Sequence, residues 1–221
     1  EIKQADLIKI TGTPISYWLS KNIIRKFETS DSVGKQGKAL TGLQTGNTEL
    51  FLRRWWEVDY SSLGLEVESR VDAKVSDFRW FKCSKGGEFR KWYGNLTYVV
   101  NWFDDGKEVK DKKQKDLKLG VITANNSKCW NQDYYFKGGL TWSMVASGGT
   151  AFRYFGDGII FDISSPTFFP NNNDEKIGML GFLNSQVSSE IATALNKAQA
   201  EMSGAKKSAS NPFFKSKYAD L

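Results

Sequence analysis

The chain has 221 residues, of which 40% are hydrophobic, and its formal net charge is +6. These values suit a globular protein with a real core, and no apolar run reaches the roughly 18 residues that a membrane span needs. Histidine is absent and cysteine occurs twice, so zinc sites and Cys/His nucleophile pairs lack their residues. We therefore expect a cytoplasmic protein without a membrane partner, in which Cys83 and Cys129 remain reduced thiols.

The basic excess is local rather than spread along the chain. Residues 79–118 contain eleven Lys/Arg and six Asp/Glu, a net charge of +5, whereas residues 1–78 contain eleven of each. A local basic surface suits a polyanionic partner, because each neutralised phosphate releases counterions. In the stretch 105–118 acids alternate with lysines, so there we favour a solvated loop over a binding surface.

The first predicted element is a helix over 14–28. Thr13 is a suitable N-cap, Pro14 suits the first helical position, and apolar residues recur at helical spacing as far as Phe27. A glycine-studded loop follows over 32–47. Next comes a short helix capped by Asn47, with one apolar face formed by Phe51, Leu52, Trp55 and Trp56.

The middle of the chain reads as a β-rich core over 42–169. Short β-branched and aromatic runs predict strands at 78–83, 97–102, 120–123, 133–136, 140–146, 151–155 and 158–163. Asp-Gly pairs at 105–106 and 157–158 and Gly-Gly pairs at 138–139 and 148–149 predict turns.

A long amphipathic helix over 174–201 is predicted after the β-rich core, followed by a polar, basic tail over 204–221. We therefore expect an α+β domain over 1–203. Its twisted, mostly antiparallel β core is flanked by the N-terminal helix and the long C-terminal helix.

A basic, aromatic hairpin is the most specific functional signal. Cations and flat rings alternate in the run KCSKGGEFRKWYGN (82–95), and this mixture suits phosphate contacts and base stacking. The binding residues expected here are Lys85, Arg90, Lys91, Trp92 and Tyr93. A hairpin whose rings belong to the core explains the composition equally well.

Two further segments are weaker signals for DNA binding. The loop GLQTGN and the two arginines after it offer an anion-binding backbone and cations, with Gly42, Thr45, Gly46, Asn47, Arg53 and Arg54 as the expected residues. Arg153 lies in a run of small donors over 139–155, for which hydroxyls bonded to the backbone are the commoner explanation.

No catalytic residue and no metal ligand is predicted. The runs SPTF (165–168) and NPFF (211–214) each lack the second proline of the amino-methyltransferase motif. A metal-dependent nuclease would need clustered acids, and Glu66, Glu68 and Asp72 are explained as well by a strand facing solvent.

Four stretches in the same order, 42–58, 85–102, 134–155 and 177–187, carry a resemblance. They resemble the C-terminal target-recognition region of adenine-specific DNA methyltransferases of the BREX phage-defence type, related to the TaqI-like specificity domain. The loop at Gly42, Thr45, Gly46 and Asn47 and the hairpin at Lys85, Gly86, Gly87, Arg90, Trp92 and Tyr93 match that region. The resemblance covers most of residues 14–190.

This resemblance implies that the chain is a DNA-binding fragment of a restriction-modification or phage-defence methylase rather than a complete enzyme. The S-adenosylmethionine site and the catalytic motif would lie in an upstream domain of the same parent chain, so no cofactor is expected here. Expected partners are double-stranded DNA, that catalytic domain and other defence-system subunits. A protein-interaction module and a metal-dependent nuclease fragment remain the alternatives.

Overall fold

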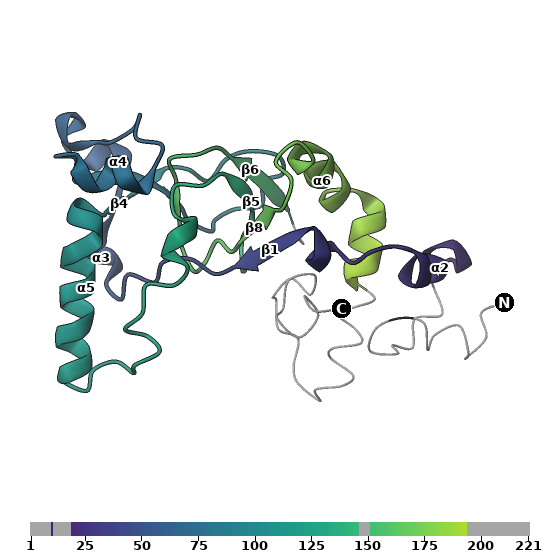
Figure 1. The fold of residues 1–221 in the computed structure, drawn as a ribbon, viewed down its shortest axis with the longest axis horizontal. Coiled ribbons are helices and arrows are strands. Elements are labelled where there is room, and N and C mark those ends of the chain that lie inside the picture. Colours follow the sequence, from purple (N-terminus) through teal and green to yellow (C-terminus); the bar gives the residue numbers. More distant parts are fainter. Residues whose placement is uncertain (1–9, 11–18, 146–150, 194–221) are drawn as a thin grey trace.

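The computed structural model describes residues 10, 19–145 and 151–193. Its described strands form two four-stranded sheets, with the orders β1-β8-β5-β6 and β2-β4-β3-β7 (Figure 1). We call them the first and the second sheet. Every strand pair is antiparallel except β3 with β7, so the predicted α+β class with a mostly antiparallel core is confirmed.

The strands are short. The first sheet contains β1 (Gly37–Leu40), β8 (Thr167–Pro170), β5 (Gly139–Trp142) and β6 (Phe152–Phe155). The second contains β2 (Leu52–Arg54), β4 (Tyr98–Asn101), β3 (Trp80–Ser84) and β7 (Ile160–Phe161). The largest cluster of buried residues draws on both sheets, and aromatic rings such as Phe81, Phe155 and Phe161 fill much of it.

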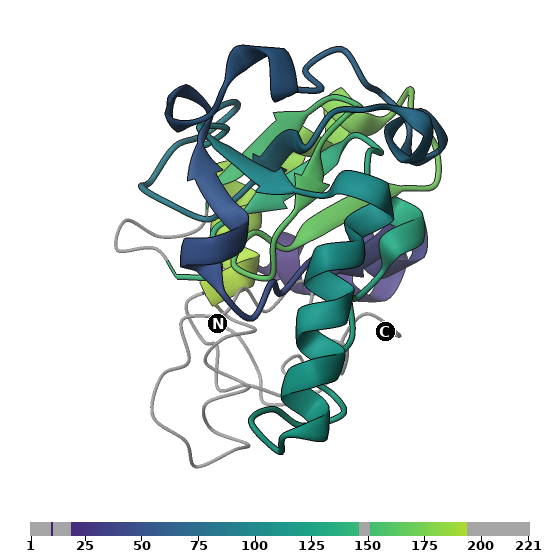
Figure 2. The same ribbon diagram turned by 90° about the vertical axis from the view of Figure 1, so that its left-hand side faces the viewer.

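Helices lie at both ends of the molecule. The α-helices are α2 (Lys21–Thr29), α3 (Thr48–Phe51), α4 (Arg70–Val75), α5 (Phe103–Lys118) and α6 (Lys176–Leu183). The 3-10 helices are η1 (Val33–Gln36), η2 (Trp55–Glu57), η3 (Tyr60–Ser62) and η4 (Gln132–Tyr134). α4 packs beside α5 at one end of the molecule, and α2 and α6 lie at the other (Figures 1 and 2).

The lysine-rich segment is helical from residue 107 onward, so the solvated loop predicted over 105–118 is wrong, although residues 105–106 form a turn as predicted. α5 spans Phe103–Lys118 and buries Val109 and Lys113, which are four residues apart and share one face of the helix. The Lys113 ammonium donates to the carbonyls of Asn126 and Lys128, at 2.8 and 3.0 Å. Val109 and the hydrogen-bonded Lys113 thus form the buried face of this otherwise polar helix.

Two predicted strands are absent, and three strands were missed. Residues 120–123 form a turn after α5, and 133–136 begin inside η4, with Tyr135 and Phe136 buried. Conversely, β1 lies within the predicted glycine loop, β2 interrupts the predicted short helix after its first turn, α3, and β8 had no predicted counterpart. These three strands have four, three and four residues, too short to show a clear sequence period.

Both flanking helices differ from their predictions. α2 begins at Lys21, where the Ser20 side chain accepts from the Ile23 amide at 3.3 Å, so the helix does not run through 19–20 as predicted. Residues 14–18 lie outside the described residues. At the other end, residues 184–185 separate α6 from a helical segment over 186–193, which contradicts one continuous helix. Residues 194–201 of that predicted helix and the tail over 204–221 also lie outside the described residues.

The predicted thiol state is confirmed. Cys83 and Cys129 are both free, Cys83 buried and Cys129 partly exposed. Burial raises the pKa of each thiol, well above its ordinary value in the case of Cys83. Such thiols remain protonated at neutral pH, as expected of cysteines that only fill space.

Candidate nucleic-acid interface

Two cations lie against one aromatic ring on the second sheet. Arg54 of β2 is the register partner of Tyr98 of β4, and its guanidinium carbon lies 4.3 Å from the Tyr98 ring centroid. Arg54 Nη1 also donates to Thr97 Oγ1 at 2.9 Å, which fixes the guanidinium. The Lys85 ammonium lies 5.1 Å from the same ring. The sheet therefore holds two positive charges and a flat ring together on a partly exposed surface.

Exposed indoles extend this surface. Trp55 and Trp56 form η2 directly after β2, meet edge to face at 5.5 Å, and are 47% and 56% exposed. The Arg54 guanidinium lies 5.7 Å from the Trp56 ring. The sequence prediction placed both tryptophans on the apolar face of a short helix, which is wrong. The signal it missed is the run RRWW, in which two cations precede two large rings.

The segment 85–97 contributes more cations and rings. It connects β3 to β4, so the predicted hairpin exists, but a loop of many residues replaces the expected tight turn at Gly86 and Gly87. The exposed residues of this 85–97 loop include Phe89, Arg90, Lys91, Trp92 and Tyr93. The Lys91 ammonium donates to the carbonyl of Asn184 at 3.1 Å.

The 85–97 loop is anchored to the first sheet, although it starts from the second. The Trp92 amide donates to the Phe152 carbonyl at 2.9 Å, and the Tyr154 amide donates to the Trp92 carbonyl at 2.8 Å. Trp92 takes a positive φ of 76° at this point. The loop thus covers the edge of β6, with Trp92 bonded to the backbone of that strand on both sides of Arg153.

The predicted residues of 42–54 divide into buried and exposed sets. Gly42 and Thr45 are buried, whereas Gly46 is exposed with a φ of +77°. The Asn47 side chain caps α3 by accepting from the Leu50 amide at 2.9 Å, and Arg53 donates to the backbone of Glu49 and Leu52. Of this set, Arg54 lies in the cluster around Tyr98. The others are explained by packing and capping, and their contact with DNA stays a prediction.

Arg153 is inside the protein, with an exposed fraction of 1%. Its guanidinium donates to the Arg90 carbonyl at 3.4 Å and to Ser143 Oγ at 3.2 Å. Burial, followed by the charge of Arg90, lowers its pKa to about 10, so it stays protonated at neutral pH. From inside the fold it contacts the 85–97 loop through that loop's backbone.

The acids near 66–72 do not gather in the described structure. Glu66 lies in a turn rather than the predicted strand, and Asp72 lies in the first turn of α4, where it accepts from Ser69 Oγ at 2.6 Å. Among the described residues there is no group of three or more side chains of metal-binding type. The geometry of this region therefore lends no support to a nuclease.

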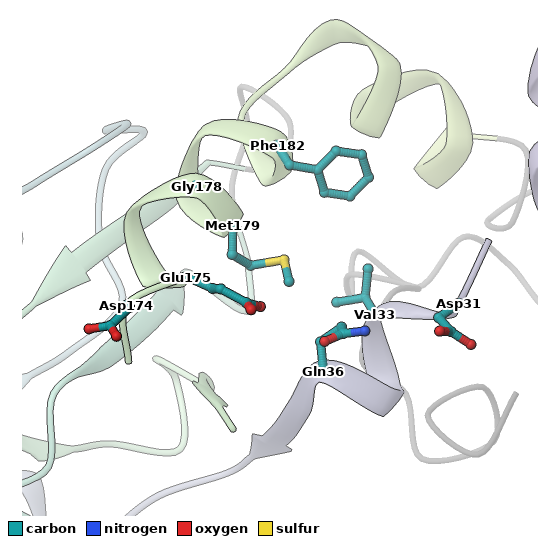
Figure 3. Close-up of a pocket in the computed structure, with 8 residues that line it drawn as sticks. All are labelled: Asp31, Val33, Gln36, Asp174, Glu175, Gly178, Met179 and Phe182. Carbon is teal, nitrogen blue, oxygen red and sulfur yellow. The ribbon is translucent and has the colours of Figure 1, made fainter. Parts of the chain in front are cut away.

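A pocket of about 420 Å³ lies between α6 and η1, toward the end of the molecule that carries α2 (Figures 1 and 3). Figure 3 shows Met179 and Phe182 of α6 facing Val33 and Gln36 of η1. The carboxylates of Asp31, Asp174 and Glu175 also line the pocket. Its acidic character differs from that of the surface around Arg54, so the two do not form one site.

Comparison with known proteins found two adenine-specific methyltransferases. The chain is 36% identical over 197 residues to adenine-specific methyltransferase PglX of Lacticaseibacillus casei (strain Zhang), across 88% of this chain and 16% of that protein. It is 36% identical over 173 residues to adenine-specific methyltransferase BrxX of Escherichia coli O9:H4 (strain HS), across 78% and 12%.

No family model matches the chain. Within the described residues, no helix is both long and apolar enough to cross a membrane. By these coverages, the chain spans less than a fifth of either methyltransferase. Most of its own length is similar to one part of each.

Proposed function

We propose that this chain is the DNA target-recognition domain of an N6-adenine-specific DNA methyltransferase from a phage-defence or restriction-modification system. Its role is to position duplex DNA for a catalytic domain in another part of the same parent chain. That domain would hold S-adenosylmethionine and receive the target adenine after the base leaves the stack. The similarity to parts of two adenine-specific methyltransferases supports this role.

One observation carries the proposal, namely the cluster of cations and rings around Tyr98, next to a loop with further exposed cations and rings. Arg54 and Lys85 lie against Tyr98, Trp55 and Trp56 are half exposed, and the 85–97 loop adds Arg90. Such cations contact phosphates, and exposed aromatic side chains stack on bases or enter grooves.

The test is the affinity of the protein for a labelled mixed-sequence duplex, measured at several salt concentrations. We expect Arg90→Ala to weaken binding about tenfold, because one charge-assisted hydrogen bond to a phosphate contributes roughly 1.5 kcal/mol. The slope of log K against log salt should fall by about 0.9, the loss of one phosphate contact. Arg25→Ala removes another exposed arginine, from α2, which belongs neither to the loop nor to the cluster around Tyr98, and should change neither value.

The aromatic part of the surface needs its own variant. Trp56→Ala should weaken binding to the same duplex about tenfold while leaving the salt slope unchanged, since an aromatic ring wedged against a base step neutralises no phosphate. The proposal fails if the wild-type protein binds no duplex at low salt. If the same protein associates with a protein partner independently of salt, the domain is a protein-interaction module instead.

A further inference from the structure

The most unusual buried group in the described structure is the guanidinium of Arg153, in the middle of β6. Only 1% of this residue is exposed, and its Nε has no hydrogen-bond partner within the described residues. Among the described residues no ion pair with a carboxylate is formed by Arg153, and the charge that acts on it is the like charge of Arg90. Burial of a cation without an anion is unfavourable, so the hydrogen bonds of Arg153 must compensate for the loss of hydration.

These hydrogen bonds lead to the 85–97 loop. Arg153 Nη1 donates to the Arg90 carbonyl at 3.4 Å, and Nη2 donates to Ser143 Oγ at 3.2 Å. Ser143 is itself bonded twice to Gly87, since its Oγ accepts from the Gly87 amide and donates to the Gly87 carbonyl, both at 3.1 Å. The planar guanidinium therefore reaches two points of the loop, one directly and one through a hydroxyl.

The backbone around Arg153 contacts the same loop. Trp92 bonds to Phe152 and Tyr154, the residues on either side of Arg153 in β6. The Asn184 side chain bonds to the amide and carbonyl of Phe152, and the Asn184 carbonyl accepts from Lys91. Arg153 thus sits at the centre of the contact between the loop and the edge of the first sheet.

We propose that Arg153 is a positioning residue, which fixes the 85–97 loop so that the exposed side chains of Arg90, Trp92 and Tyr93 are presented in one arrangement. It acts through the loop backbone and does not itself touch DNA. This inference rests on the proposed function for its biological purpose. The structural part, that Arg153 orders the loop, is independent of any ligand.

The test is hydrogen exchange of backbone amides in the absence of DNA. Arg153→Met fills similar space without donors, and we expect the amides of Gly87, Trp92 and Tyr154 to exchange at least tenfold faster. The matched control is Lys113→Met, which removes another buried cation that donates to loop carbonyls, at the opposite end of the molecule. It should speed exchange around 126–128 and leave the three loop amides unchanged. Equal exchange of those amides in Arg153→Met and the wild type would overturn the inference.

A second variant keeps the inference testable if Arg153→Met fails to fold. Arg153→Lys retains the charge but gathers its donors on one nitrogen, so it cannot span Arg90 and Ser143 as the planar guanidinium does. We expect it to fold with faster exchange of the same three amides. Loop exchange at the wild-type rate in this variant would show that the planar guanidinium does not hold the loop.

The DNA measurement separates the two proposals. If Arg153 acts through the loop, Arg153→Lys should lower duplex affinity severalfold although the charge is kept. If the wild-type protein binds no DNA, the proposed function fails, while the exchange rates still decide whether Arg153 orders the loop. Unchanged affinity beside faster loop exchange would show that DNA binding does not need the ordered loop.

Discussion

Asp105 shows how one residue can organise a helix end. It accepts from Arg70 at 2.7 and 2.8 Å and from the Lys110 ammonium at 2.8 Å, and the Trp102 indole donates to it at 3.3 Å. Burial acts to raise the pKa of this carboxyl, but the hydrogen bonds from Arg70 and Lys110 outweigh it and hold the pKa at about 2, against an ordinary 3.8. Asp105 therefore links α4 to the start of α5.

This depressed pKa predicts a pH dependence of stability. Because the folded pKa lies below the unfolded one, the stabilisation is fully present above about pH 4 and is lost as the pH falls toward 2. Asp105→Asn should lower the free energy of unfolding by about 2 kcal/mol at neutral pH. Urea unfolding at pH 7, 4 and 2 checks this, and a difference between wild type and variant that persists undiminished at pH 2 would contradict it.

Asn47 was correctly predicted to cap a helix, which is a local structural role. Asparagine before an apolar run predicts an N-cap, and the structure shows this cap on α3. The same asparagine was also a predicted DNA contact. Capping depends on neighbours three residues away, so sequence reveals it, whereas a binding role depends on what surrounds the residue in space.

Among the elements, α5 depends on the tight turn from which it starts. Asp104, Asp105 and Gly106 all have positive φ, and Trp102 lies fully buried beneath them. A Cβ on Gly106 would lie 2.5 Å from the Trp102 ring, at a φ of +73°. Both backbone strain and a steric clash therefore oppose any side chain at this position.

We predict that Gly106→Ala lowers the free energy of unfolding by at least about 2 kcal/mol, the sum of a left-handed alanine and an overpacked core. Gly120→Ala is the matched control, because Gly120 has a φ of +71° but no atom within 4 Å of the place that a Cβ would occupy. It should cost only about 1 kcal/mol. Equal losses for the two variants in urea unfolding would show that the contact with Trp102 is unimportant.

Across the whole molecule, residues 42–43 join the two sheets. The Leu43 amide donates to the Phe161 carbonyl at 2.8 Å, and the Ile163 amide donates to the Leu43 carbonyl at 3.0 Å. A Cβ on Gly42 would lie 1.8 Å from the Phe161 carbonyl oxygen, so only glycine allows this approach. After leaving β1 of the first sheet, the chain here runs alongside β7 of the second sheet.

Gly42→Ala should therefore act on the fold, lowering the free energy of unfolding by about 2 to 3 kcal/mol while leaving the duplex affinity of the folded fraction unchanged. Gly46→Ala provides the comparison, since Gly46 is exposed with open space around it, and should cost about 1 kcal/mol through its positive φ. Chemical unfolding and a binding titration on each variant check this. A stable Gly42→Ala protein with weakened DNA binding would restore Gly42 to the interface.

Several features of the molecule follow from local sequence alone. They are the α+β class, the hairpin of β3 and β4, the two strands β5 and β6, and the helix cap at Asn47. These features depend on residue periodicity, glycine turns and neighbours within four residues. The basic, aromatic loop between β3 and β4 was predictable too, because cations and rings alternate there within one short run.

Long-range packing settles which of those residues face solvent. It exposes Trp55 and Trp56, buries Arg153, and makes a helix of a lysine-rich segment through the contacts of Val109 and Lys113. It also brings Arg54, Lys85 and Tyr98 together, although they are far apart in the chain. Each outcome depends on strand pairing and side-chain packing between segments that are distant in the chain. Composition and local spacing do not specify such contacts.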